Sequence, residues 1–183
     1  LKDGDLLVVT HKIISKSEGQ LIDLRDVQPS ALAQRHAERW GKDARQIEVV
    51  LRESARIVRM QQGLIIAETH HGFVCANAAV DASNVAPGSI VLLPEDPDAS
   101  ARRIRADLAA RDGINVAVVV SDTAGRAWRH GQTDLAIGLA GMLPFESFEG
   151  RTDAYGNPLA VTAPAVADEV AGIAEVATGK LGH

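Results

Sequence analysis

The apolar run INVAVVVS, residues 114–121, limits the possible folds of this chain more than any other segment, because its β-branched residues predict a buried strand. A helix is predicted directly before it: Asp96 and Pro97 supply an N-cap and a first-turn proline, and Gly113 is a typical helix end. Together with the strand predicted at SIVLLP (89–94), this helix and strand form the only clear strand–helix–strand unit in the sequence. The other predicted strands cluster together, so we expect an α+β fold with mixed or antiparallel sheets and flanking helices.

The rest of the chain mixes strands and helices, with no linker and no repeat. Short apolar runs predict the strands, and apolar positions three to four residues apart predict the helices. The expected strands are DLLVVT (5–10), GQLIDL (19–24), GLIIAETH (63–70) and GFVCANAAV (72–80); the expected helices are 29–41, 43–59, 97–112 and about 162–178, with IISKSEG (13–19) as a turn or short helix. The inward-facing stripes are expected at Ile47, Val50, Leu51 and Ser54, at Ala101, Ile104 and Leu108, and at Val166, Val170 and Ile173.

Composition narrows the class of protein. The 183 residues are 46% hydrophobic and 23% charged, which is ordinary for a globular protein of one domain or two small interlocked ones. A formal charge of −5 argues against nucleic acid as the partner, and the single cysteine excludes a disulfide framework and a thiolate zinc cage. No stretch has the length of a membrane span and no secretory signal is present, so we expect a cytoplasmic protein.

Two aspartates occur in matched settings. Asp81 and Asp122 each follow an apolar run and precede small polar residues, so we expect both at strand ends that face one cleft. Their carboxylates should then lie within about 4–8 Å of each other, close enough to share a metal cluster. With Asn84, Thr123 and nearby arginines, they form the residue set of a Mg²⁺-dependent phosphoryl-transfer site.

The segment SDTAGRAWRHGQTD, residues 121–134, is predicted to be a functional loop that leaves the buried strand. It holds two arginines, Arg126 and Arg129, that are suitable clamps for phosphate. Trp128 indicates that the loop is pinned down, because an exposed tryptophan would be costly. Lys16 is weaker evidence, since a lone lysine after a strand is usually a surface residue.

Other candidate sites have more ordinary explanations. No glycine motif for nucleotide binding occurs, since Gly179-Lys180 follows a helix and precedes leucine. His70 and His71 are adjacent on a predicted strand and point to opposite faces, which favours structural roles. The remaining cases are Glu95, Asp96 and Asp98 as helix-start carboxylates, Asp168-Glu169 as a solvated helix face, and Cys75 as a buried, inert thiol.

Several long blocks, taken in order, resemble the coenzyme F420-0:L-glutamate ligase family. These blocks are HKIISKSEG, ETHHGFVCANAAVDASNV, LLPEDPDASARRIR, VVVSDTAGRAWRHGQTDLAIGLAGM, DAYGNPL and ADEVA. The resemblance covers nearly the whole chain, so residues 1–183 are expected to be a γ-glutamyl ligase domain. It implies GTP-dependent addition of L-glutamate to coenzyme F420-0 through a γ-linked amide, with Mg²⁺ or Mn²⁺, K⁺ as a further candidate ion, and an unusual α+β fold in an intertwined homodimer.

The resemblance also implies roles for individual residues. Asp81, Asp122 and Thr123 match positions that bind divalent metal, and the GTP site is implied at His11, Lys12, Lys16 and Asn84. The acceptor carboxylate would attack the γ-phosphate of GTP to give an acyl phosphate, which the glutamate amine then displaces. Metal ions would neutralise the repulsion between the two anions, and Lys16, Arg126 and Arg129 would clamp the phosphates.

Two departures from the family pattern stand out. Ala79 replaces a usual glycine next to Asp81, and segments that precede and follow the matched region in family members are absent, so we expect part of a longer protein. The alternative function is a nucleotide- or deazaflavin-binding module without ligase activity, which the retained metal-ligand residues disfavour. The missing glycine fingerprint disfavours an oxidoreductase.

Overall fold

The computed structural model describes residues 1–180 and contains two compact units. The first unit consists of Leu1–Thr10, Pro97–Thr123 and the chain from Gln132 onward, and the second consists of His11–Asp96 and Ala124–Gly131. Both units mix helices with small sheets, so the predicted α+β class is confirmed. None of the helices within residues 1–180 combines the length and the apolar character that a membrane crossing requires.

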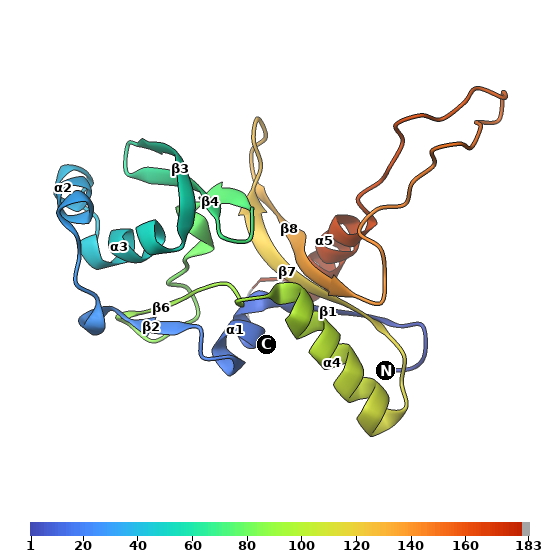
Figure 1. Cartoon of the computed structure of the whole chain (residues 1–183), viewed down its shortest axis with the longest axis horizontal. Helices are drawn as coiled ribbons and strands as arrows, with labels where there is room; N and C mark the ends of the chain where they lie inside the picture. The colour runs from blue at the N-terminus through green and yellow to red at the C-terminus, as the bar shows by residue number, and fades with distance from the viewer. Residues whose placement is uncertain (181–183) are drawn as a thin grey trace. The chain divides into compact units, whose positions relative to one another are not determined.

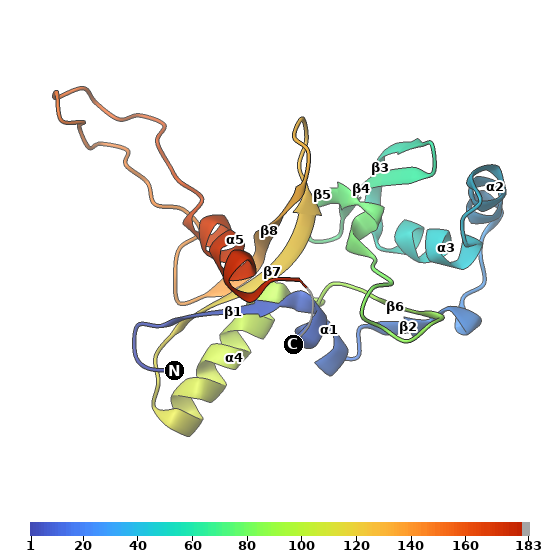
Figure 2. The ribbon, with the colours of Figure 1, turned by 180° about the vertical axis from the view of Figure 1, so that it is seen from behind.

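The first unit is built on a three-stranded sheet in the order β1-β7-β8. Its strands are β1 (Leu6–Thr10), β7 (Ala117–Gly125) and β8 (Gln132–Ala140), and its helices are α4 (Pro97–Asp112) and α5 (Val166–Thr178). β1 and β7 pair in parallel from Leu6–Ala117 to Thr10–Ser121. Figures 1 and 2 show α4 on one face of this sheet and α5 on the other.

The centre of β7 is buried on both faces. Val118, Val119 and Val120 are consecutive, so their side chains alternate between the two faces, and all three have an exposure of 0%. Complete burial of consecutive residues is expected for a strand with a helix on each side. The prediction of a buried strand at 114–121 is confirmed, although β7 begins at Ala117 and continues through Gly125.

Acidic side chains cover the backbone of β8, which lies at the edge of this sheet. Asp98 of α4 accepts a hydrogen bond from the Leu139 N–H at 2.7 Å, and Asp168 of α5 accepts one from the Ala136 N–H at 2.9 Å. Glu175 of α5 accepts from the N–H of Asp134 at 3.2 Å. These carboxylates satisfy three backbone donors of the edge strand. The prediction of a solvated face at Asp168 is therefore wrong.

Small side chains bring α5 close to the sheet. Ala167 and Ala171 are its buried residues, whereas the predicted inward-facing Ile173 is 70% exposed. The helix also begins at Val166 rather than at about residue 162. Sequence periodicity predicted that the larger apolar residues of α5 face the sheet. Instead, the helix packs on β8 through the face that carries alanines, because small side chains allow a close approach.

A long arm, residues 143–165, connects β8 to α5 and projects as an irregular loop in Figure 1. Backbone hydrogen bonds join its two sides, including Phe148 N to Thr162 O at 3.0 Å and Leu159 N to Arg151 O at 2.8 Å. It exposes several large apolar side chains, namely Leu143, Phe145, Tyr155 and Val161.

The second unit contains two sheets, three α-helices and two short 3-10 helices, η1 (Leu24–Asp26) and η2 (Asn77–Ala79). Its elements are α1 (His11–Ser17), β2 (Leu21–Asp23), α2 (Ala31–Trp40), α3 (Ala44–Arg52), β3 (Ser54–Gln61), β4 (Leu64–Thr69), β5 (Val74–Ala76) and β6 (Ser89–Val91). β2 pairs antiparallel with β6, and β3-β4-β5 form an antiparallel sheet. α2 begins at an N-cap serine, Ser30, and ends at Gly41 with a left-handed φ of 63°, as its sequence predicted.

The predicted helix over 43–59 is only half right. α3 ends at Arg52, and residues from Ser54 form β3, which pairs with β4. Ile47 and Val50 are buried in the core as expected, but Ser54 does not continue their stripe. The β-branched residues Ile57 and Val58 favour a strand, and pairing with β4 prevails over the helical spacing in the sequence.

The predicted loop over 121–134 is also wrong in extent, since β7 runs to Gly125 and β8 starts at Gln132. Only residues 126–131 lie outside the strands. Trp128 is fully exposed, so the prediction that it pins the loop is wrong. Periodicity did not show this hairpin because its strand ends consist of polar and small residues.

Two glycines, Gly138 within β8 and Gly172 of α5, should respond in opposite directions to substitution by alanine. A Cβ at Gly138 would overlap the backbone of Pro97, whereas a Cβ at Gly172 of α5 would meet only the Thr133 hydroxyl at 3.7 Å. We expect Gly138→Ala to destabilise the protein by about 1–3 kcal/mol through overpacking. We expect Gly172→Ala to stabilise it by up to about 1 kcal/mol through helix propensity. Urea denaturation would measure both, and a neutral Gly138→Ala would contradict the packing of α4 on β8.

Candidate functional site

Asp81 is held by backbone pairing to β6 rather than by the end of a strand. Its N–H donates to Val91 O at 3.1 Å, and the N–H of Val91 donates to Asp81 O at 2.8 Å. The preceding strand, β5, already ends at Ala76, and a turn at Asn77–Ala79 separates the two. The prediction that an apolar strand runs up to Asp81 is therefore corrected, but its backbone is fixed all the same.

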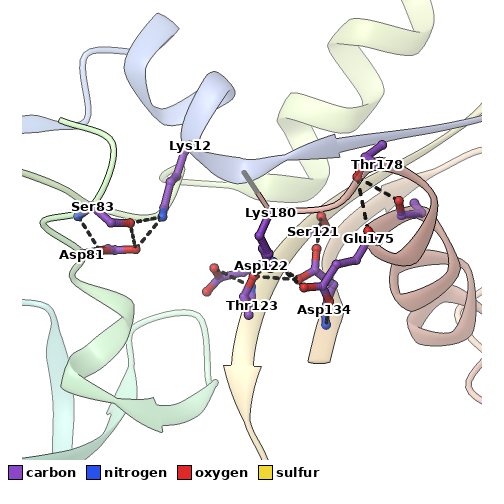
Figure 3. A network of polar contacts seen from close by, with 11 residues as sticks. Lys12, Asp81, Ser83, Ser121, Asp122, Thr123, Asp134, Glu175, Thr178 and Lys180 are labelled. Carbon is purple, nitrogen blue, oxygen red and sulfur yellow. Dashed lines mark hydrogen bonds and ion pairs between the residues drawn. The ribbon is translucent and has the colours of Figure 1, made fainter. Parts of the chain in front are cut away.

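The carboxylate of Asp81 is the centre of a small polar cluster with Lys12 and Ser83, which we call the Asp81 cluster (Figure 3). The ammonium of Lys12 lies 2.6 Å from Asp81 Oδ2, and Ser83 donates to the carboxylate through its N–H at 2.7 Å and its hydroxyl at 2.9 Å. Burial raises the pKa of the Asp81 carboxyl, but the hydrogen bonds from Lys12 and Ser83 together outweigh it and lower the pKa. The group therefore favours its charged form.

Most of the residues predicted for the GTP site lie close to this cluster. Lys12 and Lys16 are one turn apart on α1, and Lys16 donates to Asn84 O at 2.5 Å. His11 is different, since it is 1% exposed and its Nδ1 lies 3.3 Å from Ser15 Oγ. The second unit thus brings Lys12, Lys16 and Asn84 together beside Asp81, whereas His11 is a buried side chain of the helix.

The turn before Asp81 has an unusual backbone. Asn77, Ala78 and Ala79 have φ values of 52°, 49° and 58°, in the left-handed region that costs an L-residue about 1–2 kcal/mol. The resemblance seen in the sequence implies glycine as the usual residue at the position of Ala79, and glycine adopts this conformation without the cost. The alanine therefore stores backbone strain two residues before the carboxylate.

Asp122 and Thr123 lie inside β7 and not at its end. Successive side chains of a strand point to opposite faces, so Thr123 shares a face with Ser121 while Asp122 lies on the other. Within the strand, Asp122 Oδ1 accepts from the N–H of Thr123 at 2.8 Å. Their predicted role in metal binding stays a prediction.

Thr123 belongs to a second network in the first unit, the Asp134 cluster, made of Ser121, Thr123, Asp134, Glu175 and Lys180 (Figure 3). Asp134 Oδ1 accepts from the Thr123 hydroxyl at 2.6 Å, and Asp134 Oδ2 accepts from the Ser121 hydroxyl at 3.3 Å. Lys180 Nζ lies 2.6 Å from Thr123 Oγ1, 3.1 Å from Asp134 Oδ1 and 2.7 Å from Glu175 Oε1.

The Asp134 cluster contains two carboxylates, Asp134 and Glu175, that share one ammonium, Lys180. Burial raises the pKa of the Asp134 carboxyl, but hydrogen bonds from Thr123 and Lys180 outweigh it and lower the pKa. Burial lowers the pKa of Lys180, and its bonds to Glu175 and Asp134 outweigh that effect and raise the pKa. A cation thus sits among three oxygens from β7, β8 and α5.

Sequence reasoning missed Asp134, Glu175 and Lys180 as site residues. Asp134 was placed at the end of the predicted loop 121–134 and at the start of the predicted strand 134–142, and the glycines that flank residues 126–130 could have indicated a hairpin that brings it beside Thr123. Lys180 was considered only as part of a nucleotide motif. Its partner Thr123 is 57 residues away, so no local pattern could have joined them.

The two predicted phosphate clamps, Arg126 and Arg129, lie on the exposed loop 126–131. Arg126 donates to His130 O at 3.1 Å. Their role stays a prediction, as does the predicted separation of Asp81 and Asp122, because these aspartates belong to different units.

The other candidates have structural roles, as expected for the histidines. His70 Nε2 lies 2.9 Å from Arg52 O, and His71 Nε2 lies 2.9 Å from Pro94 O. Cys75 is only half-buried, so its predicted burial is partly wrong.

The chemistry of both clusters suits cations. Each offers carboxylate and hydroxyl oxygens, the ligands that Mg²⁺ and Mn²⁺ prefer. In each cluster a lysine ammonium contacts one of those oxygens at 2.6 Å. Within residues 1–180, no three His, Cys, Asp or Glu side chains group as a metal site by themselves. A divalent ion here would need ligands from substrate phosphates or water, which is the usual arrangement for Mg²⁺.

Comparison with known proteins gives a consistent match. A family model described as F420-0:Gamma-glutamyl ligase matches residues 1–183. Proteins named coenzyme F420:L-glutamate ligase from Methanopyrus kandleri and Methanothermobacter thermautotrophicus are each 45% identical over 180 residues, which is 98% of this chain and 71% of theirs. The protein of that name from Archaeoglobus fulgidus is 40% identical over 181 residues, covering 99% of this chain and 72% of the relative.

The strain at Ala79 gives a direct test of the turn beside Asp81. Ala79→Gly should stabilise the protein by about 1 kcal/mol, because glycine adopts a φ of 58° without a Cβ clash. The matched control is Ala76→Gly, at a position with a φ of −70°, which should destabilise by up to about 1 kcal/mol. Thermal and urea denaturation would compare the two variants, and a destabilising Ala79→Gly would contradict the left-handed turn.

Proposed function

The chain belongs to the F420-0:gamma-glutamyl ligase family, and we propose that it joins L-glutamate to coenzyme F420-0 through a γ-linked amide bond, with GTP as the activating nucleotide. The family resemblance recognised in the sequence is confirmed, and so is its assignment as a ligase. The observation that carries the proposed reaction is 45% identity over 98% of the chain to proteins named for it.

Amide formation from a carboxylate requires activation, because the carboxylate is a poor electrophile. In the proposed first step, a carboxylate oxygen of F420-0 attacks the γ-phosphorus of GTP, the bond to the bridging oxygen breaks, and GDP leaves. In the second, the amine nitrogen of glutamate attacks the acyl carbon, inorganic phosphate leaves and the nitrogen loses a proton. No step needs a covalent bond to the protein.

The positive side chains of α1 are the proposed contacts for the nucleotide. Lys12 and Lys16 lie one turn apart and both reach the segment that follows Asp81. A phosphate bound beside them would gain two point charges, and the side-chain amide of Asn84 would add a polar contact. The ring of His11 is buried and contacts Ser15, so His11 would contribute by its position inside α1.

We assign the divalent ions of the proposed reaction to the oxygens of Asp81, Asp122 and Thr123. Hard oxygen donors of this kind fit Mg²⁺ or Mn²⁺, and the lysine ammonium on Asp81 supports a preference for positive charge at this position. Bound metal would neutralise the charge that builds up as two anions approach. Asp81 and Asp122 themselves need only be held in place, and Arg126 and Arg129 would add positive charge from the loop.

We further propose a homodimer in which the 143–165 arm contacts a second copy. The arm carries Phe145, Tyr155 and Val161 on its surface, with Tyr155 at 93% exposure. Large apolar side chains on a projecting segment are expected at protein interfaces. The small, apolar residues of DLAIGLAGM (134–142), also predicted as a core or interface strand, form most of β8.

Incubation of the full-length protein with F420-0, GTP, Mg²⁺ or Mn²⁺ and L-glutamate should give a product heavier by one or more glutamate residues, measured by mass spectrometry. Asp122→Asn should reduce the rate by at least about 10²-fold, because the metal supplies several kcal/mol of charge stabilisation. Its folding stability should change little, because an acid held for a metal is an electrostatic liability in the empty site.

The control is Leu92→Ala, at a buried position of the second unit. It should cost about 2–5 kcal/mol of stability, while molecules that stay folded should still ligate. Normal ligation by Asp122→Asn would remove Asp122 from the mechanism. GTP binding by the wild type without any product would favour the binding-module alternative.

The proposed dimer is tested by multi-angle light scattering of the full-length protein at micromolar concentration. We expect the mass of two copies for the wild type and a shift towards one copy for the double variant Phe145→Ser, Tyr155→Ser. Ile173→Ser, at an equally exposed apolar site on α5, is the matched control and should leave the mass unchanged. A monomeric wild type would overturn the proposal.

A further inference from the structure

We propose that Asp134 is a positioning residue for Thr123: its carboxylate fixes the hydroxyl of Thr123 so that an oxygen lone pair is available to a divalent ion. The inference rests on the proposed function, because it takes Thr123 as a metal ligand. It assigns a role to Asp134, for which neither the sequence motifs nor the family resemblance supplied one.

The hydrogen bond between the two side chains has a defined direction. Asp134 presents carboxylate oxygens to this contact, and its Oδ1 also lies 3.1 Å from the ammonium of Lys180; a carboxylate oxygen beside an ammonium accepts hydrogen bonds. The 2.6 Å contact therefore requires the Thr123 hydroxyl to donate its hydrogen to Asp134 Oδ1. A hydroxyl has one hydrogen and two lone pairs, so both lone pairs of Thr123 Oγ1 are then directed away from Asp134.

One of these lone pairs is in use. The ammonium of Lys180 can only donate, and it lies 2.6 Å from Thr123 Oγ1. This leaves one lone pair on a hydroxyl whose rotation is already fixed by Asp134.

Asp134 is itself held from several directions. Its Oδ2 accepts from the buried hydroxyl of Ser121 at 3.3 Å, and its Oδ1 lies 3.1 Å from Lys180 Nζ. Its backbone N–H donates to Glu175, which also binds Lys180 through its other oxygen at 2.7 Å. These partners lie on β7, on α5 and directly after α5, so the carboxylate is held by several elements of the first unit.

A fixed ligand matters because a threonine hydroxyl is otherwise a free rotor. Residues that hydrogen-bond to a metal ligand set its orientation, and their removal commonly weakens metal binding by about 10- to 100-fold. Asp134 has the geometry for that role towards Thr123. Asp122 does not have it, since alternation along β7 places its side chain on the opposite face.

The test is the affinity of the full-length protein for Mn²⁺ alone, measured by electron paramagnetic resonance of the free ion. We expect Asp134→Ala to bind Mn²⁺ about 10- to 100-fold more weakly than the wild type. Asp134→Asn, which keeps an acceptor oxygen at the same reach, should recover part of that loss. The matched control is Asp168→Ala, which removes another carboxylate bonded to β8 but has no contact with Thr123, and should bind Mn²⁺ as the wild type does.

A double-mutant cycle separates positioning from simple charge attraction. If Asp134 acts through Thr123, then Asp134→Ala should add little to the loss already caused by Thr123→Val. Additive losses would overturn the inference, because they would mean that the charge of Asp134 acts on the ion directly. Thermal unfolding of the metal-free variants would identify those that fail to fold, in which case Asp134→Asn replaces Asp134→Ala in the cycle.

The outcomes also separate this inference from the proposed function. A loss in Thr123→Val without a loss in Asp134→Ala would overturn the positioning role and leave the proposed metal site intact. No loss in Thr123→Val would overturn both, because Thr123 would then not be a ligand. If Thr123→Val and Asp134→Ala both bound Mn²⁺ and ligated as the wild type does, the roles of both residues would be overturned. The proposed reaction would remain.

Discussion

Burial of β7 on both faces is the interaction on which the first unit depends. Three consecutive valines without exposed surface require cover on each side, and α4 and α5 supply it. Each such side chain contributes about 1.5–3 kcal/mol when it leaves water, which is a large part of the stability of a small unit. The polar residues Ser121 and Thr123 continue the same strand, so their positions follow from the apolar packing before them.

Both helices also pack against β8. There the backbone donors of the strand need hydrogen-bond partners, whereas β7 needs its apolar side chains buried. An edge strand leaves backbone donors without partners, and here Asp98, Asp168 and Glu175 accept from them. Glu175 links this structural task to the Asp134 cluster, because its second oxygen binds Lys180. Support of the strand and organisation of the polar site are thus carried by the same side chain.

Both units use lysine in the same way near their key oxygens. Lys12 pairs with Asp81, and Lys180 pairs with both Asp134 and Glu175. Partly buried carboxylates would otherwise be costly, and the paired ammonium helps to lower the pKa of Asp81 and that of Asp134. For a ligase that handles several anions, such preformed cation-preferring sites reduce the reorganisation needed when metal and phosphate bind.

Sequence reasoning succeeded where the local signal was strong. The caps at Ser30 and Gly41 correctly bounded α2, and the valine run correctly located β7. It failed where a tertiary partner decided the outcome. Residues 54–59 became a strand because β4 offered pairing, and Ile173 turned outward because Ala167 and Ala171 pack more closely on the sheet.

The sequence by itself determined the types of most elements, the family, and the presence of Asp81, Asp122 and Thr123, since these depend on spacing and residue identity along the chain. Only the tertiary structure decided that Thr123 bonds to Asp134 and Lys180, which are 11 and 57 residues away. The physical reason is that contact across strands depends on register and on helix docking. Those are set by the packing of whole elements and leave no periodic trace in the local sequence.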